Sequence, residues 1–397
     1  MSITRRQPAV SILPVRRSLA LLLLPALAAA QGIGPNAIGA VVDRGPLSPP
    51  RAPWVHVFDP ATMQLTGTVE LPTASTGVFD IEISPDLREA YVGDNNLDQI
   101  WFIDLTTSPP SLAAGTNPLQ LTGGCLDLAL SSDGRWLLAS SGNGVGTGGS
   151  SLAVVDVLHR VQASFRSFSP TSPTAVEVAP DGSVIVADLQ VATTSHHETN
   201  VRRFTIDATG TLVDTGELIG APSIPGVQDL LVPSYPHLPA PVNAWLSRHV
   251  VHVSRPAGQT LGSLQLAGLA PIASLTLDYP TGIDLAFDPL RSMVFVRTIE
   301  SPVSGPAGIG NARIDGFLFN PFTGQFHRRM VTIALERRAG TAFGCEQMAL
   351  DPLGHRLFVA GLAGGEVRVF DSMSGAQVGS MTSPDLVWVL GVAVRRN

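Results

Sequence analysis

The chain has 397 residues, of which 44% are hydrophobic, and its 25 basic residues are all arginine, against 32 acidic residues and a net charge of −7. Because there is no lysine, chemistry that needs a lysine amine is excluded, including Schiff-base formation, pyridoxal phosphate attachment and the Walker A phosphate loop. The body of the chain has no basic cluster, which argues against nucleic acid as a partner, since phosphate contacts need concentrated positive charge.

The first thirty residues have the pattern of a cleaved export signal. Residues 1–18 contain four arginines and no acid. An apolar run from Leu19 to Ala30 follows and ends in three alanines. The run is interrupted by Pro25 and is shorter than the ~20 residues that a membrane-spanning helix needs. Residues 16–19 also resemble a twin-arginine motif, with ordinary secretion as the alternative. We therefore expect residues 1–30 to be removed, and residues 31–397 to form a single soluble domain, periplasmic or secreted, with no membrane span.

The rest of the chain is built from similar units. In each, an alternating apolar strand runs into a tight turn of Pro, Asp or Gly, and a second apolar strand follows. Five segments share this pattern: 79–93, 126–139, 176–187, 283–296 and 346–360. A third strand often ends in an aliphatic-Asp or Phe-Asp pair, and a fourth short strand closes the unit. Four short strands in roughly 50 residues are typical of a β-propeller blade.

Two further units are less regular. A degenerate copy fits between residues 226 and 266, where residues 230–233, 244–246 and 250–253 can supply three strands. The chain ends supply the other copy. Residues 390–394 look like a first strand with nothing after it, and the strands expected after it are at the N-terminus: 40–42, 55–59 and 65–69. Pairing the ends in one sheet would remove the open seam of the ring.

The predicted fold is therefore all-β. We expect a seven-bladed β-propeller of four-stranded antiparallel blades, in which one blade is closed by pairing of the N- and C-terminal strands. An eight-bladed ring is the alternative. Residues 90–104 resemble the repeat of YVTN-type β-propellers, a WD40- and NHL-like class, as do residues 357–371 and, in its third-strand ending, residues 55–62. The resemblance spans most of residues 36–397; it implies a propeller and little about activity, because such folds host many functions.

The candidate site lies on the face that carries the connections between second and third strands. These connections are long at residues 44–53, 142–150, 190–200 and 300–311, whereas the turns between first and second strands are short throughout. Equivalent connections in a propeller leave from the same face, and function tends to reside on such loops. The candidate ligand-binding residues are Asp94, Asn95, Asn143, His196, His197, Glu198, Arg297 and Glu300. For each of them, the alternative is a solvated loop residue without a ligand.

A repeated acid marks the start of the first strand. Asp80, Asp127 and Asp284 share one aligned position, which Gln347 takes in the last full unit. A ring of carboxylates at a channel mouth could bind a cation. The alternative, which the repetition favours, is that each aspartate ties its backbone to the neighbouring blade, since repeat architectures reuse one structural contact in every unit.

Metal and thiol chemistry find little support. Residues 196–198, His-His-Glu, form the only cluster with metal-ligand chemistry, but no spacing rule supports a site there. The chain has no Cys-x-x-Cys-His sequence, which excludes covalent haem. We expect no metal and no other cofactor. Cys125 and Cys345 occupy the same aligned position in different units, so we expect them to lie beyond the ~7 Å that a disulfide tolerates and to be free and buried.

Two functions from different classes follow. The first is a monomeric, non-catalytic binding or interaction scaffold that engages an unidentified protein or small molecule through its long loops. The second is a lactonase- or lyase-type enzyme, a class known among similar propellers. Arg297 with Glu300, or His196 with Glu198, would then supply an acid, a base or an oxyanion partner at the channel mouth. The lack of a recognisable catalytic constellation favours the scaffold. A structural metal at the channel, without turnover, is a third alternative.

Overall fold

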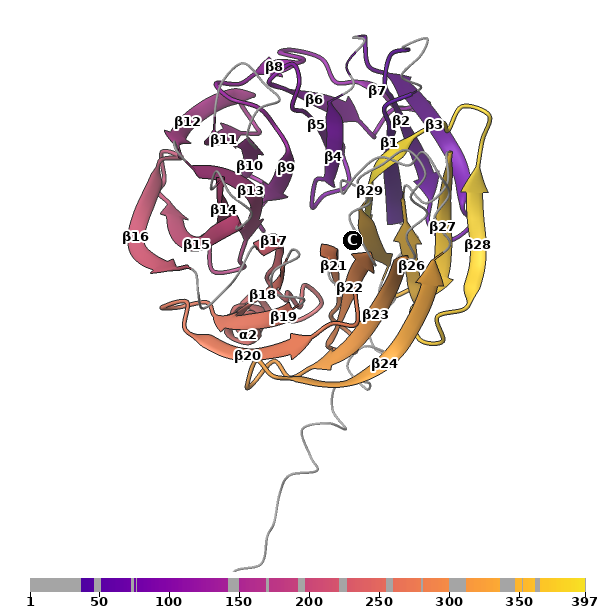
Figure 1. The fold of residues 1–397 in the computed structure, drawn as a ribbon. Helices are drawn as coiled ribbons and strands as arrows, with labels where there is room; N and C mark the ends of the chain where they lie inside the picture. The colour runs from indigo at the N-terminus through magenta and orange to yellow at the C-terminus, as the bar shows by residue number, and fades with distance from the viewer. Residues whose placement is uncertain are drawn as a thin grey trace, which may run out of the picture. The chain divides into compact units, whose positions relative to one another are not determined.

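Short apolar strands joined by turns build seven antiparallel sheets around a common centre (Figure 1). The computed structural model describes residues 37–45, 51–72, 75, 77–141, 150–168, 171–191, 197–220, 227–254, 260–279, 281–299, 312–335, 347–351, 353–360 and 365–396. Contacts within the chain separate residues 1–34 from residues 35–397, and all described residues belong to the second unit.

The seven sheets are blades, numbered here so that blade 1 joins the two ends of the chain, and each is given from its innermost strand outward (Figure 1). Blade 1 holds β29 (Val389–Arg396), β1 (Ala37–Asp43), β2 (Trp54–Asp59) and β3 (Gln64–Glu70). Blade 2 holds β4 (Val78–Ile83), β5 (Glu89–Asp94), β6 (Gln99–Asp104) and the short β7 (Ser111–Leu112) and β8 (Leu119–Gln120). Blade 3 holds β9 (Asp127–Leu130), β10 (Trp136–Ser141), β11 (Ser151–Asp156) and β12 (Val161–Ser167).

The remaining blades follow in chain order. Blade 4 holds β13 (Thr171–Val178), β14 (Ser183–Val191), β15 (His197–Ile206) and β16 (Leu212–Ile219). Blade 5 holds β17 (Val227–Leu231), β18 (His249–Ser254), β19 (Thr260–Gln265) and β20 (Pro271–Thr276). Blade 6 holds β21 (Thr281–Asp288), β22 (Met293–Ile299), β23 (Ala312–Phe319) and β24 (Phe326–Leu335), and blade 7 holds β25 (Met348–Asp351), β26 (Arg356–Val359), β27 (Glu366–Asp371) and β28 (Gln377–Thr382). The prediction of a seven-bladed propeller with four-stranded antiparallel blades is confirmed.

Burial along the strands follows from this stacking of blades. In blade 3, β10 and β11 are buried along their whole length, because neighbouring blades cover both of their faces. The outermost strand β12 instead alternates between exposed and half-buried residues. The core therefore lies between sheets: Phe58 of blade 1 meets Phe358 of blade 7 with their ring centroids 5.4 Å apart.

The chain ends close the ring as predicted. β29 pairs antiparallel with β1, from Arg396 opposite Ala37 to Val389 opposite Asp43. The two arginines at the end of β29 contact the two blades on either side of blade 1. Arg395 donates a hydrogen bond to the carbonyl oxygen of Ile83 in blade 2 at 2.9 Å. Arg396 makes two contacts of 2.6 Å with the carboxylate of Asp351 in blade 7. The C-terminal strand thus binds to three blades.

Blade 5 departs from the prediction. Residues 244–246, expected as a strand, belong to the helix α2 (Ala240–Leu246), which lies in a long connection between β17 and β18. Pro239 is the N-cap and a further proline stands in the first turn, where its fixed φ suits a helix and its missing N–H costs nothing. The expectation that every turn between first and second strands is short is therefore wrong for this blade. In the described part of the chain no helix is long and apolar enough to cross a membrane.

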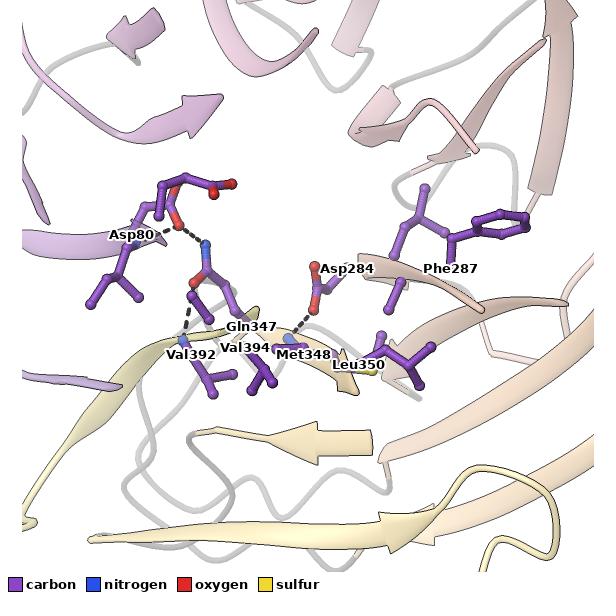
Figure 2. A pocket seen from close by; sticks show the side chains of 14 residues that line it. Asp80, Asp284, Phe287, Gln347, Met348, Leu350, Val392 and Val394 are labelled. Carbon is purple, nitrogen blue, oxygen red and sulfur yellow. Dashed lines mark hydrogen bonds between the residues drawn. The ribbon is translucent and has the colours of Figure 1, made fainter. Parts of the chain in front are cut away.

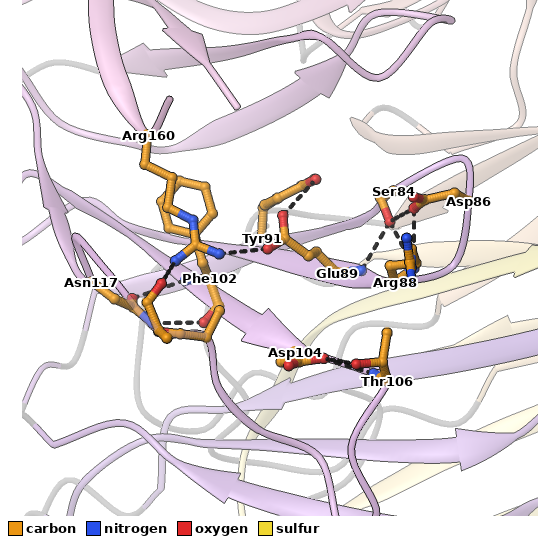
Figure 3. A network of polar contacts seen from close by, with 12 residues as sticks. Ser84, Asp86, Arg88, Glu89, Tyr91, Phe102, Asp104, Thr106, Asn117 and Arg160 are labelled. Atoms are coloured by element: carbon orange, nitrogen blue, oxygen red, sulfur yellow. Dashed lines mark hydrogen bonds and ion pairs between the residues drawn. The ribbon is translucent and has the colours of Figure 1, made fainter. Parts of the chain in front are cut away.

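In blade 2 a side chain takes the place of the middle of the outer strand. Only the ends of β6 pair with β7 and β8. Between them, the amide of Asn117 accepts a hydrogen bond from the backbone N–H of Phe102 (3.1 Å) and donates one to its carbonyl oxygen (2.7 Å). Arg160 of blade 3 covers this segment: its guanidinium lies over the Phe102 ring and contacts the Glu89 carboxylate at 2.6 Å (Figure 3). Polar side chains thus satisfy an edge that a strand would otherwise pair.

Candidate functional site

Carboxyl groups from the inner strands surround the central channel. Asp80 lies on β4, Asp127 begins β9 and Asp284 lies on β21, at equivalent positions of their blades. Each accepts a hydrogen bond from the backbone of the next inner strand: Leu128 N donates to Asp80 (2.5 Å) and Val176 N to Asp127 (2.7 Å). Met348 N donates to Asp284 in the same way (Figure 2). These are the contacts between neighbouring blades that the structural interpretation of the repeated acid requires.

Gln347 closes this series across the junction of the chain ends. Its side-chain NH₂ donates to Asp80, and its carbonyl oxygen accepts from Val392 N at 3.3 Å (Figure 2). The equivalent position of blade 1 is Gly391. A Cβ there would lie 3.0 Å from Gln347 Oε1 and 2.9 Å from the carbonyl oxygen of Phe79. Glycine therefore leaves the space through which Gln347 links blade 7 to blades 1 and 2.

Sequence reasoning missed three further acids of the channel. Asp229 on β17 accepts a hydrogen bond from Leu285 N at 2.8 Å, as the other ring aspartates do from their neighbours. Asp229 lies one residue before residues 230–233, the first strand expected in the degenerate copy. Extending that strand by one residue would have aligned Asp229 with the other repeated aspartates. Glu82 lies two residues beyond the aligned position on its strand, and so does Glu177. Strand alternation therefore places them on the same side as the aspartates.

Burial dominates the electrostatics of the channel. Desolvation raises the pKa of Asp80, Asp127 and Asp284, and the hydrogen bonds that these carboxyls accept only partly offset it. The same cause raises the pKa of Asp229 to about 7. Burial and a neighbouring carboxylate raise the pKa of Glu82 to about 7 and that of Glu177 to about 8. These groups therefore favour their neutral forms well above the usual pH range of carboxylic acids.

A cavity of about 260 Å³ opens beside three of the channel acids. The polar part of its wall comes from Asp80, Glu82, Asp284 and Gln347, and the apolar part from β21, β25 and β29 (Figure 2). Among the residues that the structure describes, no three His, Cys, Asp or Glu side chains are grouped so that they could hold a metal ion.

Asp94 and Asn95 are built into a turn. The Asp94 carboxylate, at the end of β5, is fully buried and accepts hydrogen bonds from Ser75 Oγ (2.7 Å) and from the backbone N–H groups of Asn96 (3.1 Å) and Leu97 (3.2 Å). Asn95 is also buried, and its backbone N–H donates to the carbonyl oxygen of residue 77. Both side chains thus lie inside the protein.

Arg297 lies beside one of the channel acids. It is 1% exposed and stands opposite Asp284 in the pairing of β21 with β22. Its Nη1 donates to the carbonyl oxygen of Ala360 in blade 7 at 3.2 Å. Its charge lowers the pKa of Asp284, against the stronger effect of burial. The structure therefore joins one predicted site residue to one predicted structural acid.

The other candidates divide between a strand and segments outside the described residues. His197 and Glu198 begin β15, which pairs with β14 as far as Val191. The expectation of a loop over residues 190–200 is therefore wrong, and the connection is limited to residues 192–196. Asn143, His196 and Glu300 lie outside the described residues. Cys125 is free and buried, as predicted, whereas Cys345 lies outside the described residues.

Comparison with known proteins supports the fold. No protein-family model matches the chain, and no curated protein matches it. Among solved structures, a functionally unknown protein from Desulfotomaculum acetoxidans is 18% identical, with a TM-score of 0.68 over 90% of this chain and 99% of that one.

Two other similar structures are described as lactonases. The periplasmic gluconolactonase PpgL of Pseudomonas aeruginosa is 16% identical, with a TM-score of 0.63 over 89% of this chain and 98% of that one. A proposed 6-phosphogluconolactonase of Bacteroides fragilis is 12% identical, with a TM-score of 0.64 over 90% of this chain and 98% of that one. At these identities the similarity establishes a shared propeller fold.

Proposed function

We propose that the protein is an exported, monomeric binding scaffold, periplasmic or secreted, whose propeller holds a protein or small-molecule ligand without turnover. Its repeat is of the YVTN type. The ligand binds on the loop face, which we define as the face carrying residues 44–53, 142–150, 192–196 and 300–311. A rigid ring that carries long loops on one face is a common way in which repeat folds form a binding surface.

The asymmetry between the two faces is the observation that carries this proposal. On the loop face, the connections from β1 to β2, from β10 to β11 and from β22 to β23 are long. On the opposite face, most turns between first and second strands are tight, as at Gly134, whose φ of 73° suits a compact turn. Only α2 interrupts this pattern among the described blades.

The described candidate side chains favour binding over catalysis. The Asp94 carboxylate already accepts hydrogen bonds from its own turn, and Arg297 is buried against Ala360 and Asp284. A general acid or base must reach the proton that it transfers. These two groups instead hold the loop face in place, so that the connections can present ligand contacts.

Shortening one connection tests the proposal. The wild-type protein is screened by thermal shift against metal ions, neutral oligosaccharides, gluconate and gluconolactone, and any stabilising compound is titrated by calorimetry. Replacing residues 142–149 with a short Gly-Ser turn should abolish or weaken binding without lowering the melting temperature of the free protein. Asp86→Asn, on the opposite face, is the matched control and should bind as the wild type does. Unchanged binding in the shortened variant, and in equivalent variants of the other long connections, would contradict the proposal.

A lactonase is the second candidate, favoured by the similarity to two structures described as lactonases. In that case the chain would release protons from gluconolactone faster than spontaneous hydrolysis, as followed at constant pH. The activity would be lost in Glu300→Gln or His196→Ala. The scaffold proposal expects no acceleration over heat-denatured protein, so this assay decides between the two functions.

A further inference from the structure

The helix α2 exposes its apolar side chains and turns its one polar side chain inward (Figure 1). Its exposed residues, 240–242 and Trp245, are all apolar. Asn243 is half-buried instead, and its Oδ1 accepts hydrogen bonds from Tyr235 N (2.6 Å) and Ser247 Oγ (2.9 Å). A helix on the surface of a globular protein normally has the opposite arrangement, with its polar residues towards water. The exposed side of α2 is therefore suited to contact with an apolar partner.

The turn between β23 and β24 extends this surface, on the face opposite to the loop face. Phe322 of the turn is 49% exposed, Trp245 is 52% exposed, and their ring centroids lie 5.5 Å apart. We call the exposed apolar residues of this region the apolar patch: Pro239, Ala240, Pro241, Val242, Trp245 and Phe322. An exposed apolar patch rimmed by polar groups marks a place where a protein meets another protein or a membrane.

One cation borders the apolar patch. The Arg248 guanidinium lies over the Trp245 ring, 5.1 Å from its centroid, and its Nη2 donates a hydrogen bond to the carbonyl oxygen of Phe322 at 2.8 Å. Arg248 forms no ion pair with a carboxylate in the part of the chain that the structure describes. Its charge is thus available to a partner, while its two contacts hold the aromatic rings of the patch in place.

Acids are absent from the segments that form the apolar patch. Between Asp229 and Asp278 the sequence has no Asp or Glu, and neither have residues 316–335. Asp288, in the turn of blade 6 beside this connection, is buried and pairs with Arg291. In a chain of net charge −7, these segments therefore combine exposed aromatic rings with positive charge. At a bilayer surface such rings lie at the level of the headgroups, and arginine is attracted to anionic lipid.

We propose that the apolar patch docks the protein on the surface of a membrane that contains anionic lipid. Trp245 and Phe322 enter the headgroup region, and Arg248 binds a lipid phosphate beside them. A second copy of the chain is a poorer partner, because a twofold contact would place the patch against itself and offer Arg248 no opposite charge. Docking through α2 turns the loop face away from the bilayer and leaves it open to its own ligand.

The wild-type protein allows a direct test with lipid vesicles. Of the five tryptophans, all of which the structure describes, Trp245 is the most exposed. Vesicles of phosphatidylcholine and phosphatidylglycerol in equal parts should therefore shift its fluorescence emission to shorter wavelength and carry the protein down in sedimentation. Vesicles of phosphatidylcholine alone should bind more weakly, and salt should reduce the difference between the two. Failure of the wild type to bind either kind of vesicle would overturn the proposal.

Substitutions of exposed residues then assign the contact. Trp245→Ala should weaken vesicle binding by about tenfold, and Arg248→Gln should lose the preference for anionic vesicles. The matched control is Phe165→Ala: Phe165 is 51% exposed on the outermost strand β12 of blade 3, and this variant should bind as the wild type does. Equal weakening by the control would contradict the proposal. So would self-association without vesicles that Trp245→Ala abolishes, because the patch would then belong to a contact between copies of the chain.

Discussion

The junction of the two chain ends depends on one buried carboxylate, and its removal tests how the ring is closed. Asp43, at the end of β1, is fully buried. Its carboxylate accepts hydrogen bonds from the backbone N–H groups of Gly45 (2.8 Å), Val387 (2.6 Å) and Trp388 (2.8 Å), and it pairs with Arg51 at 2.8 Å. A single side chain thus holds the segment that leads into β29.

The size of the effect follows from these contacts. Asp43→Ala leaves three backbone donors and the Arg51 guanidinium without their acceptor. A buried donor left unpaired costs about 1–3 kcal/mol, and water reaching part of the junction offsets some of this. We expect the free energy of unfolding to fall by about 3–5 kcal/mol, a large share of the ~5–15 kcal/mol that stabilises a typical protein. Asp43→Asn retains one acceptor oxygen and should lose about half as much.

Denaturant unfolding followed by tryptophan fluorescence measures this loss, because Trp388 lies in the junction, 3.8 Å from the Arg44 guanidinium. The matched control is Asp59→Ala. Asp59 also accepts hydrogen bonds from its own turn, from Ala61 N (2.8 Å) and Thr62 Oγ1 (3.0 Å), but on the surface, where water can replace it. Its loss should cost at most ~1 kcal/mol. If Asp43→Ala is no more destabilising than this control, the junction does not depend on the buried carboxylate.

Three other expectations concern the ring and its pH response. A chain that stops after Asp385 lacks β29, so calorimetry should show a lower melting temperature, and an unchanged one would contradict closure by the C-terminal strand. Gly391→Ala places a methyl group 3.0 Å from Gln347 Oε1 and should cost about 1–3 kcal/mol in denaturant unfolding; a neutral effect would argue against the tight approach. Burial lowers the pKa of His252 to about 4, so stability should fall as the pH drops from about 6.5 towards 4, and the denaturation midpoint of His252→Gln should lose part of that acid-side decline.

The blade architecture could be predicted because each unit repeats the same local chemistry. An apolar strand, a turn with Asp or Gly and a second apolar strand recur with similar spacing, and such turns impose the antiparallel reversal. At Gly134 the positive φ that this requires is observed. The shared blade was predictable for a related reason: a first strand without partners at one end complements three strands without a first at the other, and β29 does pair with β1.

The helix α2 was not predictable in the same way. It has only seven residues, and Leu246 alone is buried. Too few apolar positions contact the core to give a helical period, so the sequence of this segment resembles the strands around it.

The side-chain environment of the candidate site could not be predicted, for a different reason. Position in the repeat places Asp94 and Arg297 near the loop face, but only packing determines that both side chains are buried.

The repeat itself explains why the channel acids are both structural and titratable. An aspartate that ties one blade to the next lies near the axis, so closing the ring brings its copies towards one another, and a complete set would place seven carboxyl groups around one channel. The chain breaks the repeat at three equivalent positions. Ala175 and Gly391 carry no polar group there, and Gln347 supplies an amide that donates to Asp80. Each of the four remaining aspartates accepts a hydrogen bond from a backbone N–H of the next inner strand. The inter-blade contacts that follow from repetition and the raised pKa values of these aspartates thus have the same origin in the closed geometry of the ring.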